Sequence, residues 1–175
     1  MHGLIFTSFL QFTRSHHPER ADAIWAQEPQ YLITQAYPDE DFMRVFARAC
    51  ELTGDSTAEL QRVFGRFAAE TTFLLLYPAF YDASTGTRDF LLHVEATIHD
   101  LVRATIPGAA PPSLHVVELG AQGVSISYTS SRGLCELLHG LVTGIARHYG
   151  ESFAIEQAQC IHRGDTACVF FVTPA

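Results

Sequence analysis

Positive charge is scarce in this chain. It contains no lysine, and its 11 basic residues face 19 Asp and Glu residues, which gives a formal net charge of -8 over 175 residues. Proteins that hold nucleic acid or an anionic lipid surface need a basic patch or stripe for the phosphate groups. We therefore expect neither nucleic acid nor a membrane among the partners of this protein.

Long apolar runs and targeting signals are also missing. No run approaches the roughly 20 apolar residues of a membrane-spanning helix, and the N-terminus has neither a basic region nor a small-residue cleavage site. These absences predict a cytoplasmic protein. Its four cysteines would be kept reduced there, so we expect metal ligation or simple packing rather than disulfides.

Sequence motifs of common enzyme classes are absent as well. The chain has no glycine-rich phosphate-binding loop, no nucleophile elbow and no metalloprotease histidine pair. We therefore expect a protein that is not an enzyme.

The sequence does contain a helical first part followed by alternating strands. Apolar residues recur every three or four positions through the first two thirds of the chain, and the Pro-rich connector at 109–112 marks the change to strand-like alternation. The length and the 47% hydrophobic content suit a single α+β domain over residues 1–175, with an antiparallel sheet and one inserted helix. We predict helices over 39–53, 57–76, 87–105 and 134–149, strands over 114–119, 124–128, 153–160 and 167–173, and a turn at 120–123.

A row of hydrogen-bond donors stands at the end of the second predicted strand. Tyr128, Ser130 and Arg132 occupy every second position, which places them on one side of a strand and suits a ligand with paired carboxylates. Ser130 or Ser131 could also cap the next helix, with Arg132 in its first turn. The alternative is a strand end, a helix cap and a solvated arginine, and the motif alone favours that alternative.

A histidine lies on the apolar face of the predicted helix before the connector. His99 shares this face with residues such as Ala96 and Val102, while Glu95 and Arg103 lie at its edge. A neutral imidazole in such a setting can ligate a metal. A core histidine satisfied by a backbone carbonyl is the alternative that the helix alone favours.

Cysteine and histidine gather near the end of the sequence. Cys160 and His162 would share one face of a strand, and the following turn would return Cys168 to them. Cys135, on the preceding helix, could complete a Cys3His tetrahedron, a ligand set of structural zinc. Buried thiols with a surface histidine explain the pattern equally well. Cys50 lies on an apolar helical stripe and is expected in the core.

In combination, these motifs resemble a known family. The stretch 108–112 begins nine residues after His99, and the Tyr128-Ser130-Arg132 row follows after a hairpin. This order and spacing is similar to that of the heme nitric oxide/oxygen binding family, H-NOX or HNOB, in its bacterial stand-alone type. The opening Met1-x-Gly3-x-Ile5-Phe6 and the segment Phe64-Gly65-Arg66-Phe67 extend the resemblance across the chain.

The resemblance implies heme b held between two subdomains. The H-NOX fold would comprise a helical distal subdomain, about residues 1–60, and an α+β subdomain, about residues 61–175, with heme buried between them. His99 would ligate the ferrous iron. Pro112 falls where the family has a proline that contacts and distorts the macrocycle.

The remaining heme contacts follow from the same resemblance. Tyr128, Ser130 and Arg132 would hold the heme propionates. A large dry pocket is also needed, and the candidates for its walls are Ile5, Phe9, Phe67, Phe73, Leu137 and Leu141.

The residues expected near the iron predict which gas binds. Oxygen-binding members of the family carry a tyrosine at the position of Leu137, with an asparagine and a tryptophan at those of Ala68 and Phe9; all three residues are apolar here. Bound oxygen is polarised and needs a hydrogen-bond donor, whereas nitric oxide and CO need far less such help. We therefore expect binding of nitric oxide and CO with oxygen excluded. In the family nitric oxide breaks the bond to the proximal histidine, so rupture at His99 would be the switch.

The signal is expected to pass to a separate effector, because the chain ends at Ala175 with no kinase, cyclase or chemotaxis region. The resemblance implies a histidine kinase or a cyclic-di-nucleotide enzyme as that partner. A subset of bacterial members has a similar cysteine and histidine pattern associated with zinc and thiol redox sensing. The alternative to the whole assignment is a tetrapyrrole- or small-molecule-binding regulatory domain without gas chemistry, similar to the zinc-containing vinyl-reductase-like domains.

Overall fold

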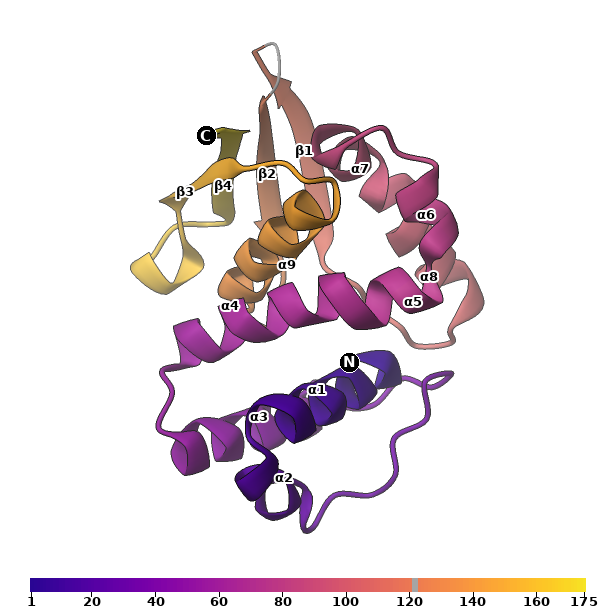
Figure 1. Ribbon diagram of the computed structural model, residues 1–175, viewed down its shortest axis with the longest axis vertical. Helices are drawn as coiled ribbons and strands as arrows, with labels where there is room; N and C mark the ends of the chain where they lie inside the picture. The colour runs from indigo at the N-terminus through magenta and orange to yellow at the C-terminus, as the bar shows by residue number, and fades with distance from the viewer. Residues whose placement is uncertain (121–122) are drawn as a thin grey trace.

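The computed structural model describes residues 1–120 and 123–175, and it consists of a helical first part followed by a sheet with one helix (Figure 1). The predicted turn at 120–123 includes residues 121 and 122, which lie outside the described residues. The first part comprises α1 (Gly3–His16), α2 (Pro18–Trp25), α3 (Asp39–Thr53), α4 (Thr57–Phe67), η1 (Ala68–Phe73), α5 (Leu74–Leu76), α6 (Pro78–Asp82), α7 (Thr87–Val94), η2 (Glu95–His99) and α8 (Asp100–Thr105). The second part comprises β1 (Ser113–Leu119), β2 (Gly123–Thr129), α9 (Cys135–His148), β3 (Phe153–Gln159), η3 (Ile161–Arg163) and β4 (Cys168–Pro174). The α+β class expected from the sequence is therefore confirmed.

Two of the predicted helices contain a stretch of π-helix. The helix predicted over 57–76 begins where the Ser56 side chain accepts a hydrogen bond from the amide of Glu59, and it continues from α4 through the π-helix η1 into α5. The helix predicted over 87–105 passes from α7 through the π-helix η2 into α8. Such π-turns insert an extra residue into a helix and are frequent at functional sites. Because η2 ends at His99, the insertion lies beside the candidate ligand.

The four strands form one antiparallel sheet in the order β1-β2-β4-β3. In the central strand β2, Tyr128 pairs with Leu114 of β1 on one side and with Cys168 of β4 on the other. This register brings the first residue of the predicted donor row next to a predicted cysteine ligand.

Helix α9 packs between the sheet and α4, and α1 to α3 lie on the far side of α4 (Figure 1). This layering creates two clusters of buried side chains. The first joins α1, α3 and α4 around several phenylalanines, and the second joins the sheet, α7 and α9. The clusters meet in η1, where Ala68 belongs to the first and Ala69 to the second. No helix among the described residues is long and apolar enough to cross a bilayer.

Glycines allow α4 and α9 to approach each other closely. A Cβ atom on Gly65 would lie 2.3 Å from the carbonyl oxygen of Leu137, and one on Gly140 would lie 2.1 Å from the carbonyl oxygen of Arg62. Real Cβ atoms do not approach backbone so closely, so any side chain at either position must push the two helices apart.

The variant Gly140→Ala tests this contact. The added methyl group meets backbone rather than a flexible side chain, so we expect a loss of about 1–3 kcal/mol in the free energy of unfolding, as for other overpacked sites. Chemical denaturation provides the measurement. The control is Arg147→Ala on the same helix, which removes an exposed ion pair with Glu70 and should change stability by less than about 1 kcal/mol. Equal stability of Gly140→Ala and the parent chain would contradict the tight contact.

Candidate functional site

A cavity of about 210 Å³ lies where the two parts of the chain meet. A cavity that holds one buried water needs only roughly 10–15 Å³, so this cavity suits a much larger ligand. Most of its wall is apolar. The predicted site residues that line it are Ile5, Phe73, His99, Pro112, Tyr128, Arg132, Leu137 and Leu141.

His99 is held in the wall of this cavity by a carboxylate. Its Nδ1 atom lies 2.7 Å from Oε2 of Glu95, one helical turn earlier, and its side chain is only 16% exposed. Burial lowers the pKa of His99, and the nearby carboxylate offsets this only in part, so the ring is neutral at pH 7. A charged carboxylate only accepts hydrogen bonds, so Nδ1 carries the proton and Nε2 keeps its lone pair for a metal.

The carboxylate of Glu95 takes part in three hydrogen bonds with described residues. Besides the His99 ring, Oε2 accepts from the amide of Leu114 at 3.0 Å, and Oε1 accepts from the Arg103 guanidinium at 2.6 Å. Burial tends to raise the pKa of Glu95, but these hydrogen bonds outweigh it, so the pKa of this carboxyl lies below its ordinary value. Glu95 is therefore ionised at neutral pH.

Tyr128 and Arg132, which follow the connector in the sequence, also line the cavity. Burial raises the pKa of Tyr128, so its hydroxyl stays protonated and can donate. The Arg132 Nη1 atom donates to the carbonyl oxygen of Ala110 at 2.6 Å, and Nε lies 2.9 Å from Oδ2 of Asp39. Arginine has five N–H donors, so these two contacts leave others for an anionic ligand.

The local structure of the donor row differs from the prediction. Helix α9 begins at Cys135 without a side-chain cap, and Ser130 instead accepts a hydrogen bond from the amide of Arg132 at 3.2 Å. Arg132 therefore lies in a turn before the helix rather than in its first turn. Gly133, in a left-handed conformation with φ of 65°, separates that turn from the helix. Ser130 itself is not among the described residues that line the cavity.

Three of the apolar residues expected near the ligand lie elsewhere. Phe9 is fully buried in the first cluster, with its ring centroid 5.0 Å from that of Phe64, and Ala68 belongs to the same cluster. Phe67 packs against this cluster too. Of the three positions used to predict gas selectivity, only Leu137 therefore lines the cavity in this structure.

Asp39 is a residue of the site that the sequence did not reveal. Its Oδ1 accepts from the amino group of Met1 at 2.6 Å, while Oδ2 faces Arg132. Burial tends to raise the pKa of Asp39, but the contacts with these two cations lower it overall. In the sequence Asp39 is only the first acidic residue of a helix, and nothing links it to a residue 93 positions away. Glu95 could have been found, since it stands four residues before His99 on one helix face.

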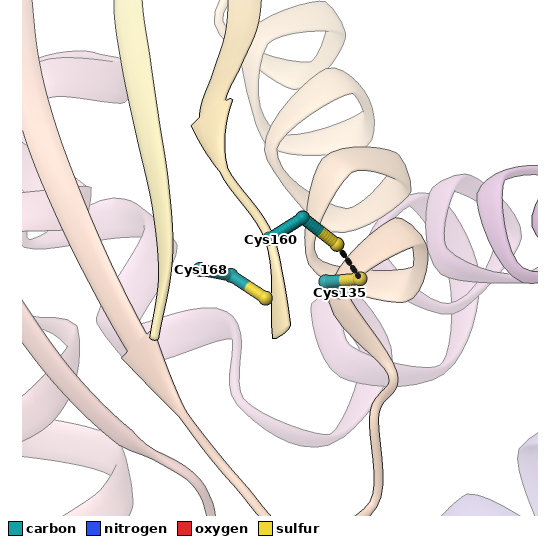
Figure 2. A group of neighbouring side chains, drawn as sticks. All are labelled: Cys135, Cys160 and Cys168. Carbon is teal, nitrogen blue, oxygen red and sulfur yellow. Dashed lines mark hydrogen bonds between the residues drawn. The ribbon is translucent and has the colours of Figure 1, made fainter. Parts of the chain in front are cut away.

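The three predicted cysteine ligands lie close together in the structure. Cys135 begins α9, Cys160 follows β3, and Cys168 begins β4 (Figure 2). Their sulfur atoms all lie within 4.8 Å of one another, with Cys135 and Cys160 at 3.9 Å, and all three side chains are buried. Burial raises the pKa of Cys135 to about 12 in the absence of a cation. A buried cluster of three thiols can hold a thiophilic metal ion.

His162 does not join the cysteines in this structure. The strand predicted over 153–160 ends at Gln159, and a short 3-10 helix, η3, replaces the strand on which Cys160 and His162 were expected to share a face. The His162 ring turns instead to the carbonyl oxygen of Gly133, 2.9 Å from Nε2. The expected Cys3His set is therefore reduced to three cysteines. Cys50 packs against the first apolar cluster, away from the other three.

Gln157 takes a position beside the cysteines that the sequence did not suggest. It lies on β3 opposite Phe170, a buried core residue of β4. Burial raises the pKa of Cys135, and the nearby amide group of Gln157 offsets this effect only in part. Its buried amide nitrogen has no well-formed hydrogen bond among the described residues. A buried polar group of this kind needs a partner, and the cysteine cluster is the neighbour at hand.

A family model described as Haem-NO-binding matches residues 2–157 of the chain. A curated relative, Soluble guanylate cyclase 89Da of Drosophila melanogaster, is 28% identical over 183 aligned positions, which cover 94% of this chain and 26% of that protein. The chain thus spans about a quarter of the length of this relative.

Solved structures agree in fold. An H-NOX protein from S. oneidensis in the Fe(II)NO ligation state has a TM-score of 0.92 at 17% identity, with 100% of this chain and 99% of that chain covered. The Fe(II) unliganded H-NOX protein from K. algicida has a TM-score of 0.84 at 22% identity, with 100% and 97% covered. The H-NOX fold expected from the sequence is therefore confirmed. Because the family model covers most of the sequence, the chain belongs to the Haem-NO-binding family and is an H-NOX domain, a heme-based gas-sensing domain.

Proposed function

We propose that the domain binds heme b in the cavity between its two apolar clusters and senses nitric oxide there. The observation that carries the proposal is the convergence of a neutral imidazole, His99, and a cationic donor, Arg132, on one apolar cavity. A heme needs a nitrogen ligand for its iron, apolar walls for its ring and donors for its propionates, and the residues present fit these needs. Bound heme supplies a ferrous iron that takes a diatomic gas.

Each residue of the cavity has a separate role in holding the heme. His99 offers Nε2 to the iron, because Glu95 holds the proton on Nδ1. Arg132 and Tyr128 bind the propionates, and Ser130 supports them by fixing the turn that carries Arg132. Pro112, the last residue of the connector, lines the cavity and would contact the heme ring.

The variant His99→Gly tests the axial ligand. Glycine removes the nitrogen and leaves space for free imidazole, so we expect the variant to lose most of the Soret absorption on purification and to regain it when imidazole is added. Heme content per chain, measured by absorption, provides the readout. The control is His93→Gly on α7, because His93 is 63% exposed and pairs with Asp89 rather than with the cavity.

Two outcomes would contradict this assignment. Full Soret absorption of His99→Gly without imidazole would mean that another residue ligates the iron. A parent chain that takes up no heme at all would instead favour the alternative of a small-molecule-binding regulatory domain without gas chemistry.

The selectivity for nitric oxide and CO over oxygen rests on the apolar side of the cavity. Ile5, Phe73, Leu137 and Leu141 line it together and offer no hydrogen to a polarised ligand. Three tyrosines also line the cavity, but Tyr128 is assigned to the propionates, and the hydroxyl of Tyr81 already donates to the carbonyl oxygen of Ala69 at 3.0 Å. Oxygen would therefore depend on Tyr77 for a hydrogen bond.

Absorption spectra in air test this selectivity. We expect the ferrous parent chain to form no stable oxygen complex, and Leu137→Tyr to raise the oxygen affinity about tenfold or more, since a hydrogen bond to a charged acceptor is worth roughly 1.5–3 kcal/mol. Leu137→Phe is the matched control, because it adds the ring without the hydroxyl. A stable oxygen complex in the parent chain would sink the proposal, and its loss in Tyr77→Phe would identify the donor.

The signal leaves the domain through His99. If His99 were released from the iron, the end of η2 would be free to move, and α8 follows it directly along the chain. Because π-turns are frequent at functional sites, η2 is our candidate for the stretch that rearranges. The receiving partner, by resemblance to the family, is a separate effector of the histidine kinase or cyclic-di-nucleotide class.

We also propose that the three cysteines hold zinc. Two thiolates on one zinc ion, each about 2.3 Å from the metal, are separated by about 3.8 Å in tetrahedral geometry. The distance between the sulfurs of Cys135 and Cys160 is 3.9 Å, close to this value and far longer than a disulfide. His162 bonds to the carbonyl oxygen of Gly133 instead, so we propose Gln157, whose amide lies near Cys135, as the residue on the remaining side of the ion. Oxidation of the thiolates would release the metal and make the site redox-sensitive.

Metal analysis of purified variants tests the ligand set. We expect one zinc per parent chain, its loss in Cys135→Ser, and its retention in His162→Ala. Gln157→Leu should bind zinc more weakly, by roughly 10- to 100-fold if the amide orients the site. Loss of zinc in His162→Ala would restore the Cys3His set, and a zinc-free parent chain with titratable thiols would favour simple thiols.

A further inference from the structure

The carboxylate of Glu95 joins three parts of the molecule through two oxygen atoms. Oε2 lies 2.7 Å from the His99 ring and 3.0 Å from the amide nitrogen of Leu114, the second residue of β1. Oε1 accepts from Arg103 on α8 at 2.6 Å. Its side chain is 28% exposed and so partly shielded from water. Three donors thus hold one carboxylate in a fixed position.

The contact with Leu114 connects Glu95 to the strand next to β2, which carries Tyr128. Leu114 pairs with Tyr128 across β1 and β2. Arg103 also donates to the carbonyl oxygen of Pro112 at 3.3 Å, so it ties α8 to the same connector. The oxygen that orients the histidine therefore also anchors the strand beside the tyrosine of the donor row.

A carboxylate in this position alters the imidazole. When Nδ1–H donates to a negative acceptor, electron density moves toward Nε2, and that nitrogen becomes a stronger base and a stronger metal ligand. The hydrogen bond also stops the ring from turning, because Glu95 itself is held by Leu114 and Arg103.

We infer that Glu95 is the positioning residue that sets the strength of the His99 ligand and couples its movement to β1. The inference rests on the proposed function, in which His99 binds the heme iron. Without Glu95 the iron–histidine bond weakens, and His99 leaves the iron more readily when a gas binds. In the intact chain, release of His99 pulls on the carboxylate that anchors Leu114.

The variant Glu95→Gln tests the inference in the heme-bound protein. Glutamine keeps the length of the side chain and can still accept hydrogen bonds, but it has no charge. We expect the iron–histidine stretching frequency in the resonance Raman spectrum of the ferrous protein to fall. We also expect heme to dissociate roughly 10- to 100-fold faster, as for other partners that orient a metal ligand.

Asp100→Asn is the matched control. Asp100 follows His99 directly, pairs with Arg103 at 2.8 Å and is 63% exposed, but it makes no hydrogen bond to the His99 ring among the described residues. Its replacement removes a nearby charge, and with it the ion pair to Arg103, without touching Nδ1. We expect the stretching frequency to stay at the parent value. An unchanged frequency in Glu95→Gln, or an equal fall in both variants, would overturn the role of Glu95.

The heme-free protein gives an independent readout of the second half of the inference. Loss of the carboxylate in Glu95→Ala should speed hydrogen exchange at the Leu114 amide, measured by NMR. Val117, three residues further along β1 and therefore with its amide on the side that pairs with β2, should stay protected. Equal exchange at Leu114 in the parent and variant chains would overturn the coupling to β1. Failure of the proposed function is distinct from both results: the parent chain would then show no iron–histidine band at all.

Discussion

The close packing of α9 against α4 is the constraint on which the site depends. The carbonyl oxygens of Arg62 and Leu137 occupy the space that side chains on Gly140 and Gly65 would need. Because the two helices touch through their backbones, the position of α9 relative to α4 is fixed. Leu137 and Leu141 on α9 therefore line the cavity as well as packing against the first apolar cluster. The same contact fixes Cys135, at the beginning of α9, relative to β4. Both candidate sites are thus positioned by one helix pair.

Two carboxylates, those of Asp39 and Glu95, lie next to residues that line the cavity. Asp39 connects the amino group of Met1 with Arg132, so an acidic residue of α3 neutralises two cations that border the cavity. Glu95 does the same for Arg103 while holding the ring of His99. Partly buried carboxylates remain ionised only if such partners offset the cost of removing them from water. The cavity therefore keeps charged residues at its rim and an apolar interior.

The sequence was sufficient for the fold class and for the main candidate residues, because both depend on local patterns. Apolar spacing indicated a helical first part, and the Pro-rich connector showed where the sheet begins. His99, Tyr128 and Arg132 stand in short motifs that alone favoured structural roles, and the resemblance of their order and spacing to the H-NOX family made them site residues. Contacts between segments that are distant in the sequence could not be predicted from local patterns. Ile5 and Phe9 stand one helical turn apart on the same face of α1, and only the packing of α3 and α4 decides that Phe9 is enclosed while Ile5 borders the cavity.

Irregular backbone explains the remaining differences. The turn at Gly133 delays the start of α9, and the 3-10 helix after β3 turns His162 away from the cysteines. Gln157 lies at an irregularity in the pairing of β3 with β4, where the register shifts between Gln157 and Gln159. Periodicity arguments assume regular elements, so they fail where an element ends or a residue is inserted.

Helix α9 carries a residue of the cysteine cluster at its first position and residues of the cavity wall two and six positions later. A helix of 14 residues moves as a rigid body, so a displacement of α9 changes both sites. If a ligand in the cavity shifts α9, the geometry around Cys135 must change with it. Thermodynamic linkage then requires reciprocity: the factor by which gas alters metal affinity equals the factor by which metal alters gas affinity.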